Sequence, residues 1–270
     1  MADILLTGLA IGESPRWHDG RLWLCNWCTG EILTVDPSGE RQVVTQVPTT
    51  FPYSIDWLPD GRLLVVSGRE RLLLRQEPDG TLVTHADLTG LAEICNEIVV
   101  DGRGNAYVDG GAQVLLVPAS GEPREVATGV RFGNGMAVTP DNATLIVAES
   151  HGRCLTAFDI LADGSLSAGR VWADLGTGCP DGICVDAEGA VWYADVPNKR
   201  CVRVREGGEV LAEVVVDRGC FACMLGGPDG TTLYVLGAEW QGMDAINPED
   251  RTGQVLVAMA PAAGAGWPAR

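Results

Sequence analysis

Six copies of one short pattern follow each other along this chain of 270 residues, and such a repeat limits the folds that the chain can adopt. Each copy has an apolar run, a turn rich in Pro, Asp and Gly, and a second apolar run. We define the anchor of a copy as the residue that closes its first run, and successive anchors are 40, 43, 38, 47 and 41 residues apart. The anchors are Trp17, Trp57, Val100, Val138, Val185 and Gly226. A period of about 40 residues is typical of one blade of a β-propeller.

The second apolar runs are short and rich in Val, Leu, Tyr and Trp, so we expect strands rather than helices. They span Arg21–Trp27, Arg62–Ser67, Asn105–Asp109, Thr144–Glu149, Ala190–Asp195 and Thr232–Leu236. Third strands are expected at Glu31–Val35, Arg71–Gln76, Gln113–Val117, Cys154–Asp159 and Cys201–Arg205. The sequence therefore predicts an all-β fold, a six-bladed β-propeller with about four antiparallel strands per blade.

The repeats run from end to end without a linker, so we expect one domain over residues 1–270. A C-terminal run, Thr252–Met259, reads as a strand that pairs with the N-terminal part of the chain and closes the ring, because an unpaired edge strand favours aggregation. We expect the tail, residues 261–270, to be poorly ordered.

The charge of the chain excludes some partners. A net charge of −17 and a pI of about 4.4 argue against nucleic acid and against anionic membrane surfaces. No run approaches the roughly 20 apolar residues of a membrane span, and the N-terminus lacks the features of a signal peptide. We therefore expect a cytoplasmic protein, a monomer or a small homo-oligomer, that acts on a small molecule.

Nine cysteines in a chain without a recognisable export signal predict reduced thiols. Two CxxC pairs, Cys25/Cys28 and Cys220/Cys223, belong to the first and last repeats, which are neighbours in a closed ring. A four-cysteine zinc site is conceivable there, but both pairs lie in strand-like runs, so core packing is favoured.

One position of the repeat, which we call the polar column, holds residues that can bind a metal or take part in catalysis. Four residues before the anchors stand Glu13, Tyr53, Asn96, Asn134, Asp181 and Ala222. The first strand of a propeller blade lines the axis, so equivalent positions ring one mouth of the channel. Four of the six offer carboxylate or amide oxygens, the ligands that Ca²⁺, Mg²⁺ and Mn²⁺ prefer. The other two, Tyr53 and Ala222, leave one side open for substrate.

The alternative interpretation is that Asn134-Gly135 and Asp181-Gly182 are simply turns. Other chemistries lack their motifs, since the chain has neither a GxSxG nor an HExxH sequence. Of the three histidines, His18 and His85 lie in turn-like or polar stretches, whereas His151 follows the strand that ends at Glu149 and is placed near the channel mouth.

The chain resembles the SMP-30/gluconolactonase/luciferin-regenerating-enzyme family. The matching segments are GESPRWHDG (12–20), ICNEIVVDGRGNAYV (94–108), FGNGMAVTPDN (132–142), CPDGICVDAEGAVWYAD (179–195) and CMLGGPDGTTLYV (223–235). The resemblance implies a six-bladed propeller with one catalytic divalent cation, most often Ca²⁺ and in some members Zn²⁺, Mn²⁺ or Mg²⁺. It implies Glu13, Asn134 and Asp181 as metal ligands, and Asn96 as a fourth polar residue that binds the metal or the substrate.

Members of the family typically hydrolyse lactones of sugar acids, and this chain departs from their pattern at two positions. The arginine that sugar lactonases often carry two residues before the Asn is Ile94 here, and the usual Asp after that Asn is Glu97. Replacing a guanidinium by an aliphatic side chain removes five hydrogen-bond donors and suggests a less polar lactone or ester. Phe51, Phe132 and Cys179 flank the column and extend an apolar rim.

We therefore expect a metal-dependent lactonase or carboxylic ester hydrolase in which Asp181 is the general base or nucleophile and Asn96 a second catalytic residue. Because a metal-bound carboxylate is a weak base, Glu149 is an alternative base. Tyr53, Ile94, Glu97, Phe132, Glu149 and His151 complete the predicted substrate site. Two alternatives stay open, a phosphotriesterase or arylesterase on the same scaffold and a non-catalytic propeller that binds a structural ion.

Overall fold

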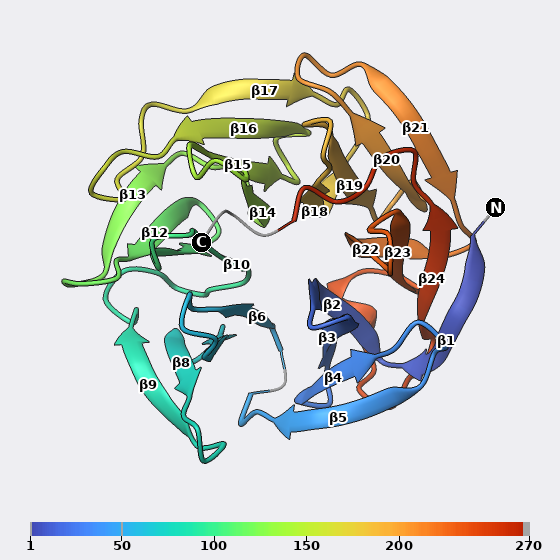
Figure 1. Ribbon diagram of the computed structural model, residues 1–270, viewed down its shortest axis with the longest axis horizontal. Coiled ribbons are helices and arrows are strands. Elements are labelled where there is room, and N and C mark those ends of the chain that lie inside the picture. Colours follow the sequence, from blue (N-terminus) through green and yellow to red (C-terminus); the bar gives the residue numbers. More distant parts are fainter. Residues whose placement is uncertain (1, 50, 267–270) are drawn as a thin grey trace.

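The computed structural model describes residues 2–49 and 51–266, which form six four-stranded sheets arranged around a central axis (Figure 1). All strand pairs are antiparallel, and within the described residues the only helix is the short 3₁₀ turn η1 (Met243–Ala245). The predicted fold class, a six-bladed β-propeller, is confirmed. No helix in the part of the chain that the structure describes is long and apolar enough to span a membrane.

The blades repeat one order of strands from the axis outward. The innermost strands are β2 (Ile11–His18), β6 (Tyr53–Trp57), β10 (Ile98–Val100), β14 (Gly133–Val138), β18 (Pro180–Val185) and β22 (Gly219–Gly226). The second strands are β3 (Arg21–Trp27), β7 (Leu63–Ser67), β11 (Ala106–Asp109), β15 (Thr144–Glu149), β19 (Val191–Asp195) and β23 (Thr232–Ala238). The third strands are β4 (Glu31–Val35), β8 (Leu72–Gln76), β12 (Gln113–Val117), β16 (Cys154–Asp159), β20 (Arg200–Val204) and β24 (Gly253–Met259). The outer strands are β5 (Arg41–Gln46), β9 (Leu82–Asp87), β13 (Arg124–Thr128), β17 (Arg170–Asp174), β21 (Val210–Val215) and β1 (Asp3–Leu9).

The ring is closed by strands from both ends of the chain. In the sixth blade β24 lies between β23 and β1, so the first strand of the chain completes the last sheet (Figure 1). The predicted pairing of the C-terminal strand with the N-terminal part of the chain is confirmed.

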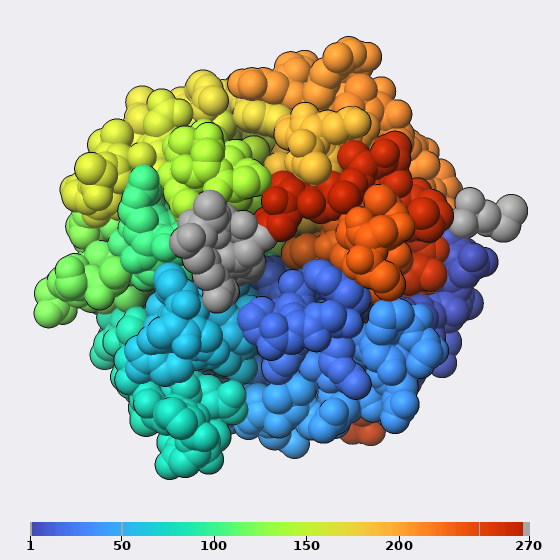
Figure 2. All heavy atoms as spheres, in the orientation of Figure 1, coloured from blue at the N-terminus to red at the C-terminus, as the bar shows by residue number. Residues whose placement is uncertain are grey.

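The tail differs from the expectation of poor order over residues 261–266. Gly264 forms a β-bridge with Asp186 and donates a hydrogen bond to the Gly230 carbonyl, while Ala265 N–H donates to Val185. This segment therefore runs toward the axis across the face shown in Figure 2. Residues 267–270 lie outside the described part of the chain.

Among the described residues the core consists of six larger apolar clusters, one between each pair of neighbouring blades, and a small seventh cluster of Ile11, Phe221 and Ala238. Between blades two and three, for example, Leu64 and Val66 pack with Ile98, Val108 and Leu115, all fully buried. Burying a side chain of this size stabilises the fold by about 1.5–3 kcal/mol. Because each cluster is shared by two blades, no blade buries its apolar surface alone.

β-Bulges shape the inner strands at the positions of the polar column. The strand register shifts between Glu13 and Arg16 in β2, between Gly133 and Met136 in β14, and between Pro180 and Ile183 in β18. Bulges re-aim side chains, and here they lie next to the channel mouth. Asn134-Gly135 and Asp181-Gly182 are thus parts of strands, and their interpretation as turns is wrong.

Gly135 is required by the close approach of two inner strands. A Cβ placed on Gly135 would lie 2.5 Å from the Asp181 carbonyl oxygen and 2.6 Å from the Ile183 nitrogen, both backbone atoms. We predict that Gly135→Ala lowers the free energy of unfolding by about 1–3 kcal/mol because β14 and β18 must separate. Gly90→Ala is the control, since a Cβ there meets no atom within 4 Å. Equal stability of the two variants in urea unfolding would contradict this account of the inner strands.

Candidate active site

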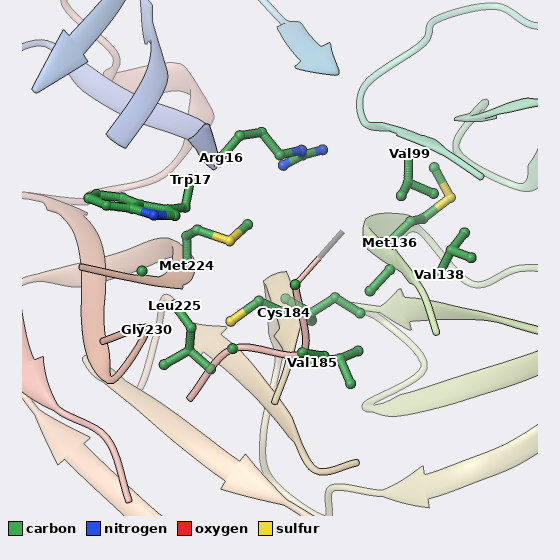
Figure 3. Close-up of a pocket in the computed structure, with 16 residues that line it drawn as sticks. Arg16, Trp17, Val99, Met136, Val138, Cys184, Val185, Met224, Leu225 and Gly230 are labelled. Carbon is green, nitrogen blue, oxygen red and sulfur yellow. The ribbon is translucent and has the colours of Figure 1, made fainter. Parts of the chain in front are cut away.

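The central channel has a cavity at each end. A smaller one of about 220 Å³ is lined by anchor-side residues of the inner strands, among them Trp17, Val138 and Val185 (Figure 3). Gly264 of the tail also lines it. A larger cavity of about 500 Å³ lies at the opposite end, where the inner strands begin. Its size is within the range of pockets that enclose a whole small molecule.

The four oxygen-bearing residues of the repeat column all line the larger cavity. Glu13, Asn134 and Asp181 lie on β2, β14 and β18, and Asn96 stands two residues before β10. The Asn96 side-chain amide donates a hydrogen bond of 3.3 Å to Asn134 Oδ1. The structure thus brings together the side chains that the sequence predicted as a metal site.

Ser150 fixes the orientation of Asn134. The Asn134 amide nitrogen donates to Ser150 Oγ at 3.4 Å, and the Ser150 hydroxyl donates to the Pro180 carbonyl at 2.7 Å. Because the amide nitrogen is held by Ser150, Asn134 Oδ1 is directed toward Asn96. Ser150 lies just after β15 and links the blade that carries Asn134 to the strand that carries Asp181.

The two carboxylates of the site lie close to each other, with Glu13 buried and Asp181 half-buried. Burial raises the pKa of Glu13 well above its usual range, and the charges of Asp181 and Glu97 raise it further. Burial also raises the pKa of Asp181, with a smaller contribution from Glu97, while a hydrogen bond from Asn134 opposes the rise. Asp181 Oδ1 is buried and has no hydrogen-bond partner. Such a pair of carboxylates with a free oxygen is the environment that a cation would stabilise.

The donor set suits a hard cation. Among residues 2–49 and 51–266 no group of three or more His, Cys, Asp and Glu side chains is arranged to hold a metal, so an ion at this mouth would take amide ligands as well. Glu13 and Asp181 supply carboxylates and Asn96 and Asn134 supply amide oxygens. Oxygen ligands of this kind fit Ca²⁺, Mg²⁺ or Mn²⁺ better than soft metals.

We call Glu13, Asn96, Asn134 and Asp181 the polar ring. Glu97, which the sequence predicted as a substrate-binding residue, does not line the cavity and lies behind this ring. Its Oε1 accepts hydrogen bonds from Ser14 Oγ (3.1 Å), from the Arg16 guanidinium (3.1 Å) and from Ile98 N–H (2.9 Å). Arg16, itself buried, also lies 3.9 Å from Asp56. These partners direct the Glu97 carboxylate toward Arg16 and away from the cavity.

Two other residues predicted to contact substrate are also placed outside the cavity wall. Tyr53 is fully buried, and its hydroxyl lies 2.7 Å from the Asn26 carbonyl and 2.9 Å from the Glu31 carbonyl. Glu149 accepts hydrogen bonds from the Thr156 hydroxyl (2.5 Å) and Arg131 N–H (2.9 Å). Because these partners hold Glu149 within its blade, the structure does not present it to the cavity as a base.

Ile94, Phe132 and His151 do line the cavity. The rings of Phe132 and His151 stack with centroids 4.5 Å apart. Phe132 has a φ of 59°, in the left-handed region that is rare for a bulky residue. Conformations of this kind cluster at functional sites, where surrounding contacts hold them in place.

Asp109, at the end of β11, is a cavity residue that the repeat column did not identify. Burial raises its pKa to about 7, and its Oδ2 has no hydrogen-bond partner. A second column of the repeat contains it, because several second strands end in a polar residue: Ser67, Asp109, Glu149 and Asp195. Aligning the strand ends would have pointed to Asp109.

The cysteines do not form the conceivable four-cysteine site. Cys25 is buried in the cluster between blades one and two, whereas Cys220 and Cys223 pack with Cys184 and Cys201 between blades five and six. All nine cysteines are free thiols. The expectation of reduced thiols that serve mainly as core residues agrees with this placement.

The chain is thus a six-bladed propeller with carboxylate and amide oxygens gathered at one mouth of its channel. The chain is a member of the SMP-30/Gluconolactonase/LRE-like family, whose model matches residues 11–239. The resemblance read from the sequence is thereby confirmed.

Three relatives illustrate this membership. The chain is 26% identical to pentonolactonase XacC of Haloferax volcanii over 91% of its length and 88% of that protein. It is 34% identical to regucalcin of Xenopus laevis, over 87% of this chain and 85% of the relative. A solved structure described as a calcium-binding protein, regucalcin, from Agrobacterium tumefaciens has the same fold, with a TM-score of 0.81 and 21% identity over 100% of this chain and 97% of that one.

The placement of Glu97 generates a prediction. Glu97→Ala leaves the buried Arg16 guanidinium without its closest carboxylate, so we expect a loss of about 3–5 kcal/mol in the free energy of unfolding. Glu93→Ala, an exposed position in the same segment, is the matched control and is expected to change stability by less than about 0.5 kcal/mol. If Glu97→Ala unfolded like the control and changed only KM for a substrate, the structural role assigned to Glu97 would be wrong.

Proposed function

We propose that this protein is a divalent-metal-dependent hydrolase that opens a lactone ring. The observation that carries the proposal is the convergence of Glu13, Asn96, Asn134 and Asp181 at one end of the channel, with a buried Asp181 oxygen that no protein donor satisfies. The name of a relative that spans most of the chain, a pentonolactonase, supports lactone hydrolysis as the reaction. The large cavity accommodates a small-molecule substrate.

Glu13, Asn134 and Asp181 would hold the cation, with Asn96 beside it. Ca²⁺ is our first candidate because all donors are oxygens and a similar fold is described as a calcium-binding protein; Mg²⁺, Mn²⁺ and Zn²⁺ are the alternatives. When bound, a divalent cation supplies Lewis-acid polarisation of a carbonyl oxygen. It would also offset the repulsion between the buried Glu13 and Asp181 carboxylates.

Each polar side chain of the site would have a separate role in hydrolysis. Asp181 Oδ1, which has no donor in the protein, would face the cation, and the other carboxylate oxygen of Asp181 would accept a proton from the water that attacks the lactone carbonyl carbon. Asn96 Nδ2 is a donor at the cavity surface that orients the carbonyl oxygen. As the ring C–O bond breaks, the proton held by Asp181 passes to the departing alkoxide, and the product is a hydroxy acid. Ser150 keeps Asn134 in position and takes no part in proton transfer.

Removing the charge of Asp181 tests this proposal. We predict that Asp181→Asn lowers kcat/KM for lactone hydrolysis at least about 10³-fold and abolishes divalent-cation binding in calorimetry, while the circular dichroism spectrum and thermal unfolding stay native-like. Asp229→Asn, which changes an exposed turn carboxylate, should keep both properties. Treatment of the unmodified protein with EDTA should likewise remove the activity. Full turnover by Asp181→Asn, or EDTA-insensitive turnover, would refute the proposal.

Ser150 provides a milder test of the same site. Ser150→Ala removes the hydroxyl that orients Asn134, so we expect cation affinity to fall about 10–100-fold without loss of folding. Ser120→Ala, in an exposed turn, serves as the control. Unchanged affinity in calorimetric titration of Ser150→Ala would argue that Asn134 does not bind the ion.

A further inference from the structure

A second ring of side chains lies outside the polar ring. The residue two places before each member of the polar column lies at or shortly before the start of its inner strand, at the same mouth of the channel. Five of these six positions line the cavity, and all five are apolar or carry sulfur: Ile11, Phe51, Ile94, Phe132 and Cys179. In the sixth blade a register shift between Cys220 and Ala222 replaces the expected position with Phe221. We call these six residues the apolar ring.

Neighbouring aromatic side chains support the apolar ring. Trp27 packs edge-on against Phe51 with centroids 4.9 Å apart, and Trp240 packs edge-on against Phe221 at 5.3 Å. The only polar side-chain atom of Trp27, Nε1, donates a hydrogen bond of 2.6 Å to the Tyr53 carbonyl and is therefore not available to a ligand. These contacts extend the apolar wall and limit its freedom to change shape.

The cavity separates polar and apolar groups. None of the described residues that line it is Arg or Lys, and Glu13, Asn96, Asp109, Asn134, Ser150 and Asp181 lie at or next to inner-strand starts or second-strand ends. The imidazole of His151 is the one polar side chain among the described lining residues that stacks on a member of the apolar ring, Phe132. Two members of the apolar ring are exposed: Ile94 has 42% and Phe132 has 51% of its surface accessible to solvent. A ligand with hydroxyl groups on every carbon would bury several of them against this wall without partners, which is unfavourable.

We propose that the site takes a lactone with an unbranched alkyl substituent, bound with its carbonyl at the polar ring and its chain along the apolar ring toward the mouth. This inference rests on the proposed lactonase function. The exposed faces of Ile94 and Phe132 are the surfaces that the chain covers, and these two residues are specificity determinants. Among the described residues, a polyhydroxylated lactone would meet the His151 imidazole at this level of the cavity but no charged or amide donor.

The inference is tested with a series of γ-lactones that differ only in the length of the alkyl chain, from none to octyl. Gluconolactone is measured with them as the polyhydroxylated comparison. Burial of each methylene group is expected to raise kcat/KM about fourfold until the cavity is filled. Gluconolactone is expected to react at least about 100-fold more slowly than the best alkyl lactone, since an apolar wall discriminates against added hydroxyls by roughly that factor.

Ile94→Arg places a guanidinium in the apolar ring. We expect it to lower kcat/KM for the octyl lactone at least about tenfold and to flatten the dependence on chain length, because an ionised group is costly to cover with an alkyl chain. Val171→Arg makes the same change at a position of the outer strand β17 that is 64% exposed, and it should leave the series unaltered.

Binding of 2-alkylcyclopentanones, measured by calorimetry, separates this inference from the proposed function, because these ketones have the shape of the lactones and cannot be hydrolysed. Rates and affinities that both rise with chain length support the inference. Turnover that is independent of chain length, or fastest with gluconolactone, overturns it and leaves the lactonase function intact. Affinity that rises with chain length without turnover of any lactone supports the apolar site and contradicts the lactonase. If the protein neither hydrolyses any of the lactones nor binds the ketones in a way that depends on chain length, both this inference and the lactonase function are overturned.

Discussion

The pairing of β1 with β24 is the interaction on which the rest of the structure depends. It joins the first strand of the chain to the last sheet and turns a row of six similar sheets into a closed ring. Each apolar cluster lies between two blades, so closure is also what allows the first and last blades to bury their facing surfaces, as Leu24 and Leu236 do. Only in a closed ring do six inner strands meet around one axis.

That convergence explains how residues from separate repeats form one site. Glu13, Asn134 and Asp181 are far apart in the chain, yet equivalent positions on the inner strands bring them to one mouth of the channel. Burying two carboxylates so close together is unfavourable by itself. The proposed cation would compensate for this cost, and the apolar ring above it would keep bulk water away from the reaction. In this view the same geometry that holds the ion also selects the substrate.

The sequence predicted the fold and the polar column because both are encoded in the repeat. Strand positions follow from apolar periodicity and turn residues; β4, β12 and β16 have the predicted bounds. The direction of a single side chain is a different matter, since it depends on partners in other blades. The Glu97 side chain is directed toward Arg16, which lies 81 positions away in the chain. The residues next to Glu97 in the sequence do not predict that contact.

The repeat column does not predict Asp109 and Ser150 as cavity residues, for a related reason. Both follow or end second strands, outside the column that the anchors define. Their roles become visible only when the second strands are seen to reach the same mouth of the channel as the starts of the inner strands. The bulges in β2, β14 and β18 were equally beyond the sequence pattern, because a bulge arises from the fit between paired strands.

The central claim is that one divalent cation binds where Glu13, Asn134 and Asp181 meet. The most direct measurement is an anomalous difference map from crystals of the protein soaked with Mn²⁺. Our account predicts one strong peak in contact with Asp181 Oδ1 and with oxygens of Glu13 and Asn134. A map without a peak at this mouth of the channel, with the Glu13 and Asp181 carboxylates bound only to protein groups and water, would contradict it.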